Sequence, residues 1–366
     1  MSERIRVAIA GLGRGSHFFP AFRSHPATEI VALCDPDEGR LAEAAKATGA
    51  QELYTVYEKM LDRARPDAVV VATPMHLHAE HSIAALQRDI HVLAEVTAAV
   101  NMNEARWLVR ACQRTRAVYM MAENCNRYKS CMLVEAMVSA GLFGEVYYVE
   151  SEYLHPLPFL HHTPEGRPTW RYYWHVGING HTYPTHSLGP CLQWMRERPE
   201  RLSCIGSGRW SDLEHDIEDT ILVQCKTSSG KLIHLRGDLL SRRPFSLNWA
   251  LQGTKGAYEG GRGPGARHWV WLEGYSRDPE EWLPLESFEA EFLPELWRNP
   301  PPEAADPGPG GSTYFTVLDF VAAVQGLCPP TIGIHQAMDM TLPGLVSQES
   351  IRRGGEWLPV PNSRDW

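Results

Sequence analysis

The sequence has no long hydrophobic run and no Cys-x-x-Cys pair. No segment reaches the roughly 18 uninterrupted apolar residues of a membrane-spanning helix. The opening Met-Ser-Glu-Arg also lacks the basic and apolar pattern of a secretory signal. The eight cysteines are scattered, which argues against a zinc ribbon or a thioredoxin-like motif. These absences predict a soluble, cytoplasmic protein whose thiols are reduced and mostly buried.

A surplus of positive charge is also absent. The chain has 35 Lys and Arg against 44 Asp and Glu, a formal net charge of −9. No overall basic field therefore attracts nucleic acid or an anionic membrane, and we expect neither as a partner. The 366 residues are 43% hydrophobic and 22% charged, as in ordinary globular proteins. This length predicts two domains, each large enough to bury a core.

The first third of the chain alternates short apolar runs with helical patterns. The expected strands cover residues 6–10, 29–34, 68–72 and 91–94, and the expected helices cover residues 17–24, 40–48, 78–88 and 103–115. Because strand and helix alternate strictly, we expect an α/β domain over residues 1–123, built on a doubly wound parallel sheet.

Beyond residue 123 the pattern changes to runs of strands with few helices between them. One helix is expected over residues 130–140, and strands over residues 145–153, 220–226, 232–239 and 247–253. We therefore expect residues 124–366 to form an α+β domain with a mostly antiparallel, open sheet, and leave open that the C-terminal segment packs back on the first domain. The Pro- and Gly-rich residues 294–311 are expected to form a long loop.

A glycine-rich loop, Gly11-Leu12-Gly13-Arg14-Gly15-Ser16, follows the first strand and precedes a helix. Gly11 permits a tight turn and Gly13 lets the backbone approach a pyrophosphate, while Ser16 stands where a third glycine is usual. Asp35 ends the second strand, where a carboxylate binds both ribose hydroxyls and repels a 2′-phosphate, which favours NAD over NADP. The alternatives are a glycine turn without a ligand, and an Asp35 that only caps the next helix.

A series of short motifs follows this loop. It consists of Thr73-Pro74, His78, Ala84-Ala85-Leu86, His91-Val92-Leu93 and Glu95, with Gly253-Thr254-Lys255-Gly256, Phe320, Ser350, Gly354-Gly355 and Pro361 further along. The series resembles the Gfo/Idh/MocA oxidoreductase family over nearly the whole chain. The resemblance implies a Rossmann domain for NAD and a second α/β domain whose open sheet faces the nicotinamide. One departure is that Glu95-Val96-Thr97 stands where dehydrogenases of the family carry Glu-Lys-Pro, so the lysine that touches the reacting hydroxyl is missing.

Other motifs are similar to one branch of that family, glycoside hydrolase family 109. They are Glu95-Val96, Glu123-Asn124-Cys125, Tyr153, His155, Trp170-Arg171, Tyr183-Pro184-Thr185-His186 and Leu188-Gly189-Pro190. This branch consists of NAD-dependent glycosidases with valine in place of the lysine. Two departures concern the substrate: Phe245 replaces a tyrosine, and Gly308-Pro309-Gly310-Gly311 replaces Gly-His-Gly-Gly.

The glycine loop and the two resemblances together nominate the site residues. We assign cofactor binding to Gly11, Gly13, Arg14, Gly15, Ser16, Asp35, Thr73, Met75, His76, His78, Glu95, Val96 and Asn124. Substrate binding is assigned to Glu123, Arg171, Thr185 and Phe245, and catalysis to Tyr153, His155, Tyr183 and His186.

The resemblance implies a redox route to hydrolysis with a tightly bound, recycled NAD. Transient oxidation at sugar carbon 3 acidifies the hydrogen on carbon 2, a base removes it, the group on carbon 1 leaves, water adds and the hydride returns. Histidine titrates near neutrality and tyrosine serves as a base beside a cation, so either Tyr183 or His186 could be the carbon-2 base. Arg171 or His155 is the expected cation, with Tyr153 and His155 around the sugar hydroxyls.

Two other functions remain open. A net NAD-dependent sugar or polyol dehydrogenase could use His186 or Tyr183 in place of the lysine, and a non-catalytic NAD-binding sensor would bind nucleotide without turnover. A metal site among His161, His162, His175, His181 and His186 is an alternative without a helical i, i+4 pair or a Cys partner, so we expect no metal. The open sheet favours a homodimer or homotetramer.

Overall fold

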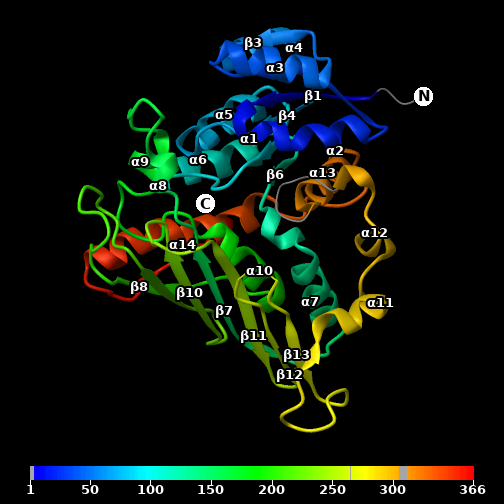
Figure 1. Cartoon of the computed structure of the whole chain (residues 1–366). Coiled ribbons are helices and arrows are strands. Elements are labelled where there is room, and N and C mark those ends of the chain that lie inside the picture. The colour runs from blue at the N-terminus through cyan, green and yellow to red at the C-terminus, as the bar shows by residue number, and fades with distance from the viewer. Residues whose placement is uncertain (1–3, 264, 305–310) are drawn as a thin grey trace. The chain divides into compact units, whose positions relative to one another are not determined.

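The computed structural model describes residues 4–263, 265–304 and 311–366 (Figure 1). The chain divides into two compact units. The first unit comprises Met1–Arg127, Pro300–Met338 and Ser363–Trp366, and the second comprises Tyr128–Asn299 and Asp339–Asn362. Within the described ranges, no helix combines the length and apolar character needed to cross a membrane.

The first unit is built on a six-stranded parallel sheet with strand order β3-β2-β1-β4-β5-β6. The strands are β1 Ile5–Ala10, β2 Thr28–Cys34, β3 Glu52–Tyr54, β4 Ala68–Val71, β5 His91–Ala94 and β6 Tyr119–Met121, and the main helices are α2 Phe19–Ser24, α3 Glu38–Thr48, α4 Tyr57–Ala64, α5 His78–Leu86 and α6 Met102–Gln113. This order is that of the Rossmann fold. The expected doubly wound parallel sheet is confirmed; β3, α4 and β6 were not expected from the sequence.

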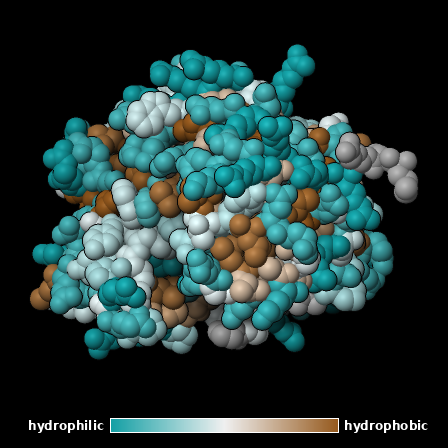
Figure 2. All heavy atoms as spheres, turned by 90° about the horizontal axis from the view of Figure 1, so that it is seen from above, coloured by the Kyte–Doolittle hydropathy of each residue, from teal (hydrophilic) through white to brown (hydrophobic). Residues whose placement is uncertain are grey.

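Local sequence explains how these elements form. All four residues of β4 are fully buried, as a strand covered by helices on both faces requires. Helix α3 begins after Asp37, whose side chain accepts hydrogen bonds from the amides of Gly39 and Arg40, and it ends at Gly49 with φ +79°. The helices turn polar side chains to solvent. Figure 2 shows hydrophilic side chains over most of the face that carries α3 and α4, with hydrophobic ones in small separate groups.

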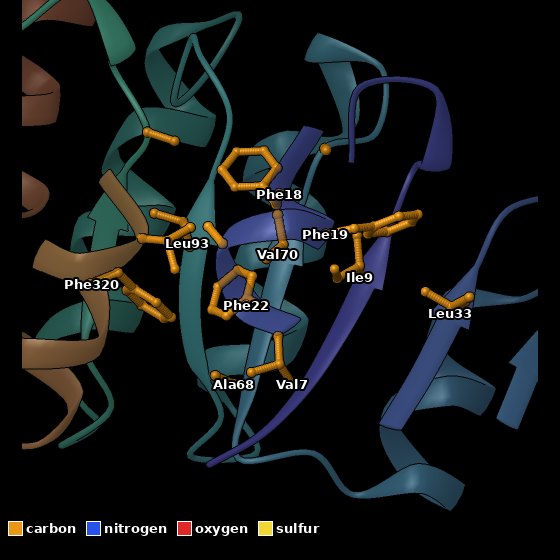
Figure 3. Packing of buried hydrophobic residues seen from close by; sticks show 14 of the residues in the cluster. Val7, Ile9, Phe18, Phe19, Phe22, Leu33, Ala68, Val70, Leu93 and Phe320 are labelled. Carbon is orange, nitrogen blue, oxygen red and sulfur yellow. The ribbon is translucent and has the colours of Figure 1, made fainter. Parts of the chain in front are cut away.

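A C-terminal helix completes the core of the first unit. Val317, Phe320 and Val321 of α13 (Ser312–Val324) belong to the same buried cluster as residues of β1 and α2, and Figure 3 shows Phe320 turned toward Phe22. Residues 300–338 therefore group with the first unit, although the sequence analysis placed them in 124–366. The reason is that the apolar face of α13 is buried against an element more than 290 residues earlier in the chain.

The second unit is built on a nine-stranded sheet of order β14-β13-β12-β11-β7-β10-β9-β8-β15. Its strands are β7 Val146–Leu154, β8 Arg201–Gly206, β9 Ile221–Lys226, β10 Leu232–Asp238, β11 Ser246–Gly253, β12 Gly256–Glu259, β13 Trp269–Leu272, β14 Leu283–Pro284 and β15 Leu358–Pro359. All the neighbouring pairs are antiparallel except β7 with β10, which is parallel. The expected mostly antiparallel sheet is confirmed.

Helix α10 (Thr185–Met195) packs on this sheet against β7, β10 and β11, and α7 (Lys129–Ser139) packs on α10. The Trp249 indole of β11 donates to the Ser187 carbonyl oxygen of α10 at 3.0 Å and fixes the helix on the sheet. Helix α14 (Ile334–Arg352) begins in the first unit and continues in the second. Because α10 follows directly from residue 184, this packing decides where the candidate catalytic side chains lie.

The expectation of a structureless loop over residues 294–311 is wrong for part of that segment. Helix α12 (Glu295–Arg298) forms one turn and Pro302–Ala304 forms a 3-10 turn. The helical turn closes because the Arg298 guanidinium binds both the Leu293 carbonyl oxygen, at 3.1 Å, and the Glu295 carboxylate, at 2.7 Å. Residues 305–310, which include Gly308, Pro309 and Gly310, lie outside the described residues.

Candidate active site

The three glycines of the first loop have different structural roles. Gly11 has φ +83°, and a Cβ there would overlap the backbone of Ala72, so only glycine fits. A Cβ on Gly13 would meet nothing within 4 Å, so the backbone there faces open space that suits a phosphate. A Cβ on Gly15 would lie 2.8 Å from Ile9, so Gly15 permits close packing on β1. Ser16, which stands where a third glycine is usual, donates its hydroxyl to the Gly13 carbonyl oxygen at 3.1 Å.

Asp35 holds the glycine loop against the end of β2. Its carboxylate is 3% exposed and accepts hydrogen bonds from the amides of Leu12, at 2.8 Å, and Asp37, at 2.9 Å. The cap of α3 is Asp37, so the alternative that Asp35 only caps this helix does not hold. A carboxylate at the carboxyl end of this strand is placed as a ribose ligand would be.

Arg14 and Glu95 form an ion pair that links the glycine loop to the end of β5. The Arg14 Nε atom lies 2.6 Å from Glu95 Oε1, and the guanidinium lies 5.7 Å from the centre of the Phe18 ring. Glu95 and the following Val96 are buried, with 6% and 3% exposure. The pair brings together two of the nominated cofactor residues.

His78 joins the loops that follow β4 and β5. Its Nδ1 atom lies 2.9 Å from the carbonyl oxygen of Thr97 and its Nε2 atom 2.7 Å from that of Thr73. Burial lowers the pKa of His78, although both carbonyl groups oppose this shift. Both ring nitrogens of His78 therefore contact the backbone of these loops and position them. The nominated Met75 is buried and His76 half-buried in the turn Met75–Leu77 just before α5.

Glu123 and Asn124 follow β6 at the same edge of the parallel sheet. The Asn124 side chain is 5% exposed and donates to the Ser312 hydroxyl of α13 at 3.3 Å. The Glu123 carboxylate is 1% exposed and accepts from the Cys125 amide at 3.0 Å. These two nominated residues therefore belong to the first unit.

In the second unit the rings of four nominated residues come together. Tyr153 lies near the end of β7, Tyr183 precedes α10 and His186 lies in its first turn. The ring centroids are 5.9 Å apart for Tyr153 and Tyr183, 5.2 Å for Tyr153 and His186, and 5.0 Å for Tyr183 and His186. Phe245 packs edge-on against Tyr153 at 5.9 Å. We refer to Tyr153, His155, Tyr183, His186 and Phe245 as the ring cluster.

His155 completes the ring cluster by a short hydrogen bond. Its Nδ1 atom lies 2.5 Å from the Tyr153 hydroxyl, and its ring lies 4.8 Å from Phe245. Burial lowers the pKa of His155 to about 4, and electrostatic interaction with His186 and Arg171 lowers it further. A neutral His155 accepts a hydrogen bond from the Tyr153 hydroxyl. Of the two cations expected beside the tyrosines, Arg171 is therefore the one that is charged at neutral pH.

Arg171 lies on α9 (Trp170–Trp174), and His175 caps the C-terminus of this helix. The Arg171 guanidinium stacks over Trp170 at 4.2 Å, and the pKa of Arg171 is lowered by burial but supported by Tyr183 and Tyr153. His175 lies 4.9 Å from the Tyr183 ring, is 2% exposed, and its pKa is well below the usual value because of burial. The sequence motifs do not assign His175 to catalysis or substrate binding; its spacing of four residues from Arg171 was the available signal.

Thr185 is fully buried at the start of α10. A small cavity lies next to the residues that precede it, Thr182 and Tyr183. The cavity, of about 10 Å³, is lined by Tyr153, Tyr183, His181 and Ile217, among others. This volume suits roughly one water molecule. From Tyr183 the chain continues through Pro184 into the eleven-residue helix α10, whose first turn carries His186.

The histidines considered for a metal do not form a common site. His161 packs against His215 at 5.1 Å, while His175 packs against Tyr183. Among the described residues, His161, His162, His175 and His181 do not bring three ligand atoms together.

The comparisons with known proteins agree with the two units. Residues 5–123 match the sequence model of the Gfo/Idh/MocA oxidoreductase family with its NAD-binding Rossmann fold, and residues 132–259 match the Gfo/Idh/MocA C-terminal domain. Residues 206–364 match the C-terminal domain of glycosyl hydrolase 109. The fold and these matches define an NAD-binding enzyme of the oxidoreductase fold.

Curated relatives cover nearly the whole chain. A glycosyl hydrolase family 109 protein of Saccharopolyspora erythraea is 30% identical over 98% of this chain and 83% of its own length. One of Streptomyces filamentosus is 31% identical over 98% of this chain and 77% of its own. The chain therefore belongs to glycosyl hydrolase family 109, within the Gfo/Idh/MocA oxidoreductases. Both resemblances, the enzyme class and NAD as the cofactor are confirmed.

Solved structures share the fold at lower identity. Levoglucosan dehydrogenase in complex with NADH and L-sorbose is 19% identical with a TM-score of 0.84, covering 99% of this chain and 100% of that one. A probable dehydrogenase from Thermotoga maritima is 17% identical with a TM-score of 0.75, covering 97% of this chain and 98% of that one. At these identities the likeness establishes the fold alone.

Proposed function

We propose that this protein is an NAD-dependent glycosidase that cleaves a glycosidic bond by transient oxidation at sugar carbon 3, elimination, water addition and re-reduction. The main support is the combination of buried Val96, where dehydrogenases of the family carry lysine, with Tyr183 and His186 in ring contact beside Arg171. Without the lysine, the proton chemistry falls to these residues.

The residues of the first unit fit the cofactor. Gly13 leaves open space at the loop, Asp35 lies at the carboxyl end of β2, and Arg14 and Glu95 are paired beside them. When bound, NAD supplies a hydride acceptor that can return the hydride, so it is not consumed. We assign Gly11, Gly13, Arg14, Gly15, Ser16, Asp35, Thr73, Met75, His76, His78, Glu95, Val96 and Asn124 to holding it, of which His78 acts through the loops that it joins.

Tyr183 and His186 are the proposed pair for proton removal at carbon 2. The guanidinium of Arg171 interacts electrostatically with the hydroxyls of Tyr183 and Tyr153, so a tyrosinate formed on either is stabilised by the cation. His186, 5.0 Å from Tyr183 between ring centroids, can receive or return the proton. This arrangement supports Tyr183 as the base and His186 as its proton partner.

Tyr153 and His155 are proposed to act on the sugar hydroxyls. The neutral His155 ring accepts a hydrogen bond from Tyr153 at 2.5 Å, so it orients the Tyr153 hydroxyl, whose oxygen can then accept a hydrogen bond from a substrate hydroxyl. Phe245, 46% exposed, offers an apolar edge where the family has a tyrosine. Glu123, Arg171 and Thr185 are proposed substrate contacts.

One experiment tests this function against a net dehydrogenase. The purified protein is denatured to identify any released nucleotide, and the native protein is given aryl glycosides without added NAD. We expect bound NAD and glycoside cleavage in the wild type, and we expect His186→Ala to abolish the cleavage while it keeps the bound NAD. Steady NADH accumulation on free sugars, matched to sugar oxidation, would instead establish a dehydrogenase. Bound nucleotide without turnover would indicate a sensor.

A further inference from the structure

Four large apolar side chains of the second unit are exposed on three short segments. Phe159 of α8 (Pro158–His161) is 72% exposed and Tyr173 of α9 is 56% exposed, while Trp210 and Leu213 of the loop 207–219 are 78% and 72% exposed. Figure 1 shows α8 and α9 as adjacent turns. Exposed apolar groups that gather on neighbouring segments mark a ligand or partner surface.

Ring contacts join these three segments into one surface. His161 of α8 packs on His215 of the loop at 5.1 Å, and Tyr172 of α9 packs on the same His215 at 4.8 Å. His162 packs on Tyr172 at 5.1 Å. The surface of α8, α9 and residues 207–219, which we call the aromatic platform, is therefore held together from beneath by rings.

The loop of the aromatic platform is fixed by a buttressing carboxylate. Asp219 accepts hydrogen bonds from the amides of Trp210, at 3.1 Å, and Ser211, at 2.8 Å. The Trp210 indole N–H donates to the Ser207 carbonyl oxygen at 2.7 Å. Since this N–H is already paired, the indole offers its apolar face to a ligand, and a fixed loop loses little entropy on binding.

The loop of the aromatic platform adjoins the ring cluster through the buried Ile217. The Ile217 amide donates to the Val176 carbonyl oxygen at 3.1 Å, just after α9, and Ile217 lines the same small cavity as Tyr153 and Tyr183. Helix α9 itself carries both Arg171 and the exposed Tyr173. A molecule that extends from the ring cluster along α9 would therefore meet the aromatic platform.

We propose that the aromatic platform is a leaving-group subsite that binds a second sugar ring, so that the substrate is an oligosaccharide. This inference rests on the proposed glycosidase function, which requires a group on carbon 1 beside the ring cluster. Flat aromatic faces such as those of Trp210 and Tyr173 stack on the C–H faces of pyranoses. Ile217 of the loop lines the same cavity as Tyr153 and Tyr183, so the platform lies next to the ring cluster. This position favours a sugar ring over a second protein as the occupant.

The test compares substrates that differ only in the leaving group. Trp210→Ala and Tyr173→Ala are assayed on methyl glycosides and on disaccharides with the same non-reducing sugar. We expect kcat/KM for the disaccharide to fall about tenfold, mostly through KM, with the methyl glycoside within about twofold of wild type. Trp107→Ala, which removes an indole of 56% exposure from the first unit, should leave both unchanged.

Other outcomes overturn the proposal. Equal losses on both substrates, or no loss on either, would remove the leaving-group role. A change of mass by light scattering in Trp210→Ala with unchanged disaccharide kinetics would make the platform a contact between copies of the chain. If the wild type cleaves no glycoside, the proposed function fails, and calorimetry with the disaccharides decides the subsite: binding that Trp210→Ala abolishes supports it, and no wild-type binding overturns it.

Discussion

The Tyr153 hydroxyl lies 2.5 Å from the Nδ1 atom of His155, two residues further along the chain. The two side chains meet because alternate residues of an extended chain point to the same side, and the His155 amide continues the pairing of β7 by donating to the carbonyl oxygen of Asp238 at 2.9 Å. A neutral His155 accepts the hydrogen bond of the tyrosine and so fixes the direction of its hydroxyl group. The contribution of the Tyr153 hydroxyl to turnover can therefore be tested by substitution.

Removal of the Tyr153 hydroxyl should impair turnover without loss of cofactor. For Tyr153→Phe we expect kcat/KM on glycosides to fall by about 100-fold or more, the usual size of a lost acid–base contribution. Nucleotide content after denaturation should stay at the wild-type level. Tyr147→Phe, a substitution at a 47%-exposed position of the same strand, is the matched control. Tyr153→Phe activity within about twofold of wild type would show that the hydroxyl takes no part.

The glycine loop predicts two opposite outcomes for alanine substitutions. Gly13→Ala should keep the stability of the nucleotide-free protein within about 0.5 kcal/mol, because its Cβ meets no atom, yet weaken NAD binding. Gly11→Ala should destabilise the first unit by more than about 1 kcal/mol, because of φ +83° and overlap with Ala72. Urea unfolding and calorimetric titration with NAD measure these effects. Gly13→Ala with wild-type NAD affinity would contradict the assignment.

Two neighbouring aspartates should separate cofactor choice from helix capping. For Asp35→Ser we expect NAD affinity to fall about tenfold or more and NADP affinity to rise, because the carboxylate no longer binds the ribose or repels a 2′-phosphate. Asp37→Ala should cost about 1 kcal/mol of stability as a lost cap, with an unchanged NAD to NADP ratio. Titration with both nucleotides checks the pair. An unchanged ratio in Asp35→Ser would assign Asp35 to loop structure alone.

Buried neutral histidines should make the protein less stable in mild acid. Burial lowers the pKa of His181 to about 4, against 6.5 when exposed. Between about pH 6.5 and pH 4 the unfolded chain takes up a proton that the folded chain refuses, so the free energy of unfolding falls as pH falls and levels off below pH 4. His155, His161 and His81, with pKa values also lowered to about 4, act in the same direction.

The share of His181 can be measured by substitution. The shift corresponds to roughly 3 kcal/mol lost between pH 7 and pH 4. In His181→Asn the loss of unfolding free energy over this interval should be smaller by up to about that amount, because asparagine takes up no proton. His162→Asn, at an exposed position, should keep the wild-type pH dependence. An unchanged dependence in His181→Asn would contradict a neutral, buried His181.

The sequence predicted the long and strongly patterned elements. The four apolar residues of β4 and the alternation around them predicted the parallel sheet, and the predicted helices over 78–88 and 103–115 agree with α5 and α6. The three-residue strands β3 and β6 were missed because they are too short for a periodic pattern. They exist because they complete the edges of a sheet that longer strands have already formed.

For the candidate site, the motifs nominated individual residues, but they did not predict which of these residues contact one another. The motif Tyr183-Pro184-Thr185-His186 nominated residues that the structure brings into the ring cluster with Tyr153. The contact of His175 with Tyr183 was not predicted, because it joins two segments separated by a stretch of chain that carries no motif. The close packing of Gly15 on Ile9 was not predicted, because only the structure reveals which residue of the loop faces Ile9.

The sequence by itself determined the nucleotide loop, the acidic end of β2 and the valine at position 96, because each depends on residue type and local backbone geometry. Tertiary structure alone decided that Phe245, Tyr153 and His186 meet and that α13 belongs with β1. These relationships join residues far apart in the chain. They follow from which apolar faces are buried together, a choice that local patterns leave open.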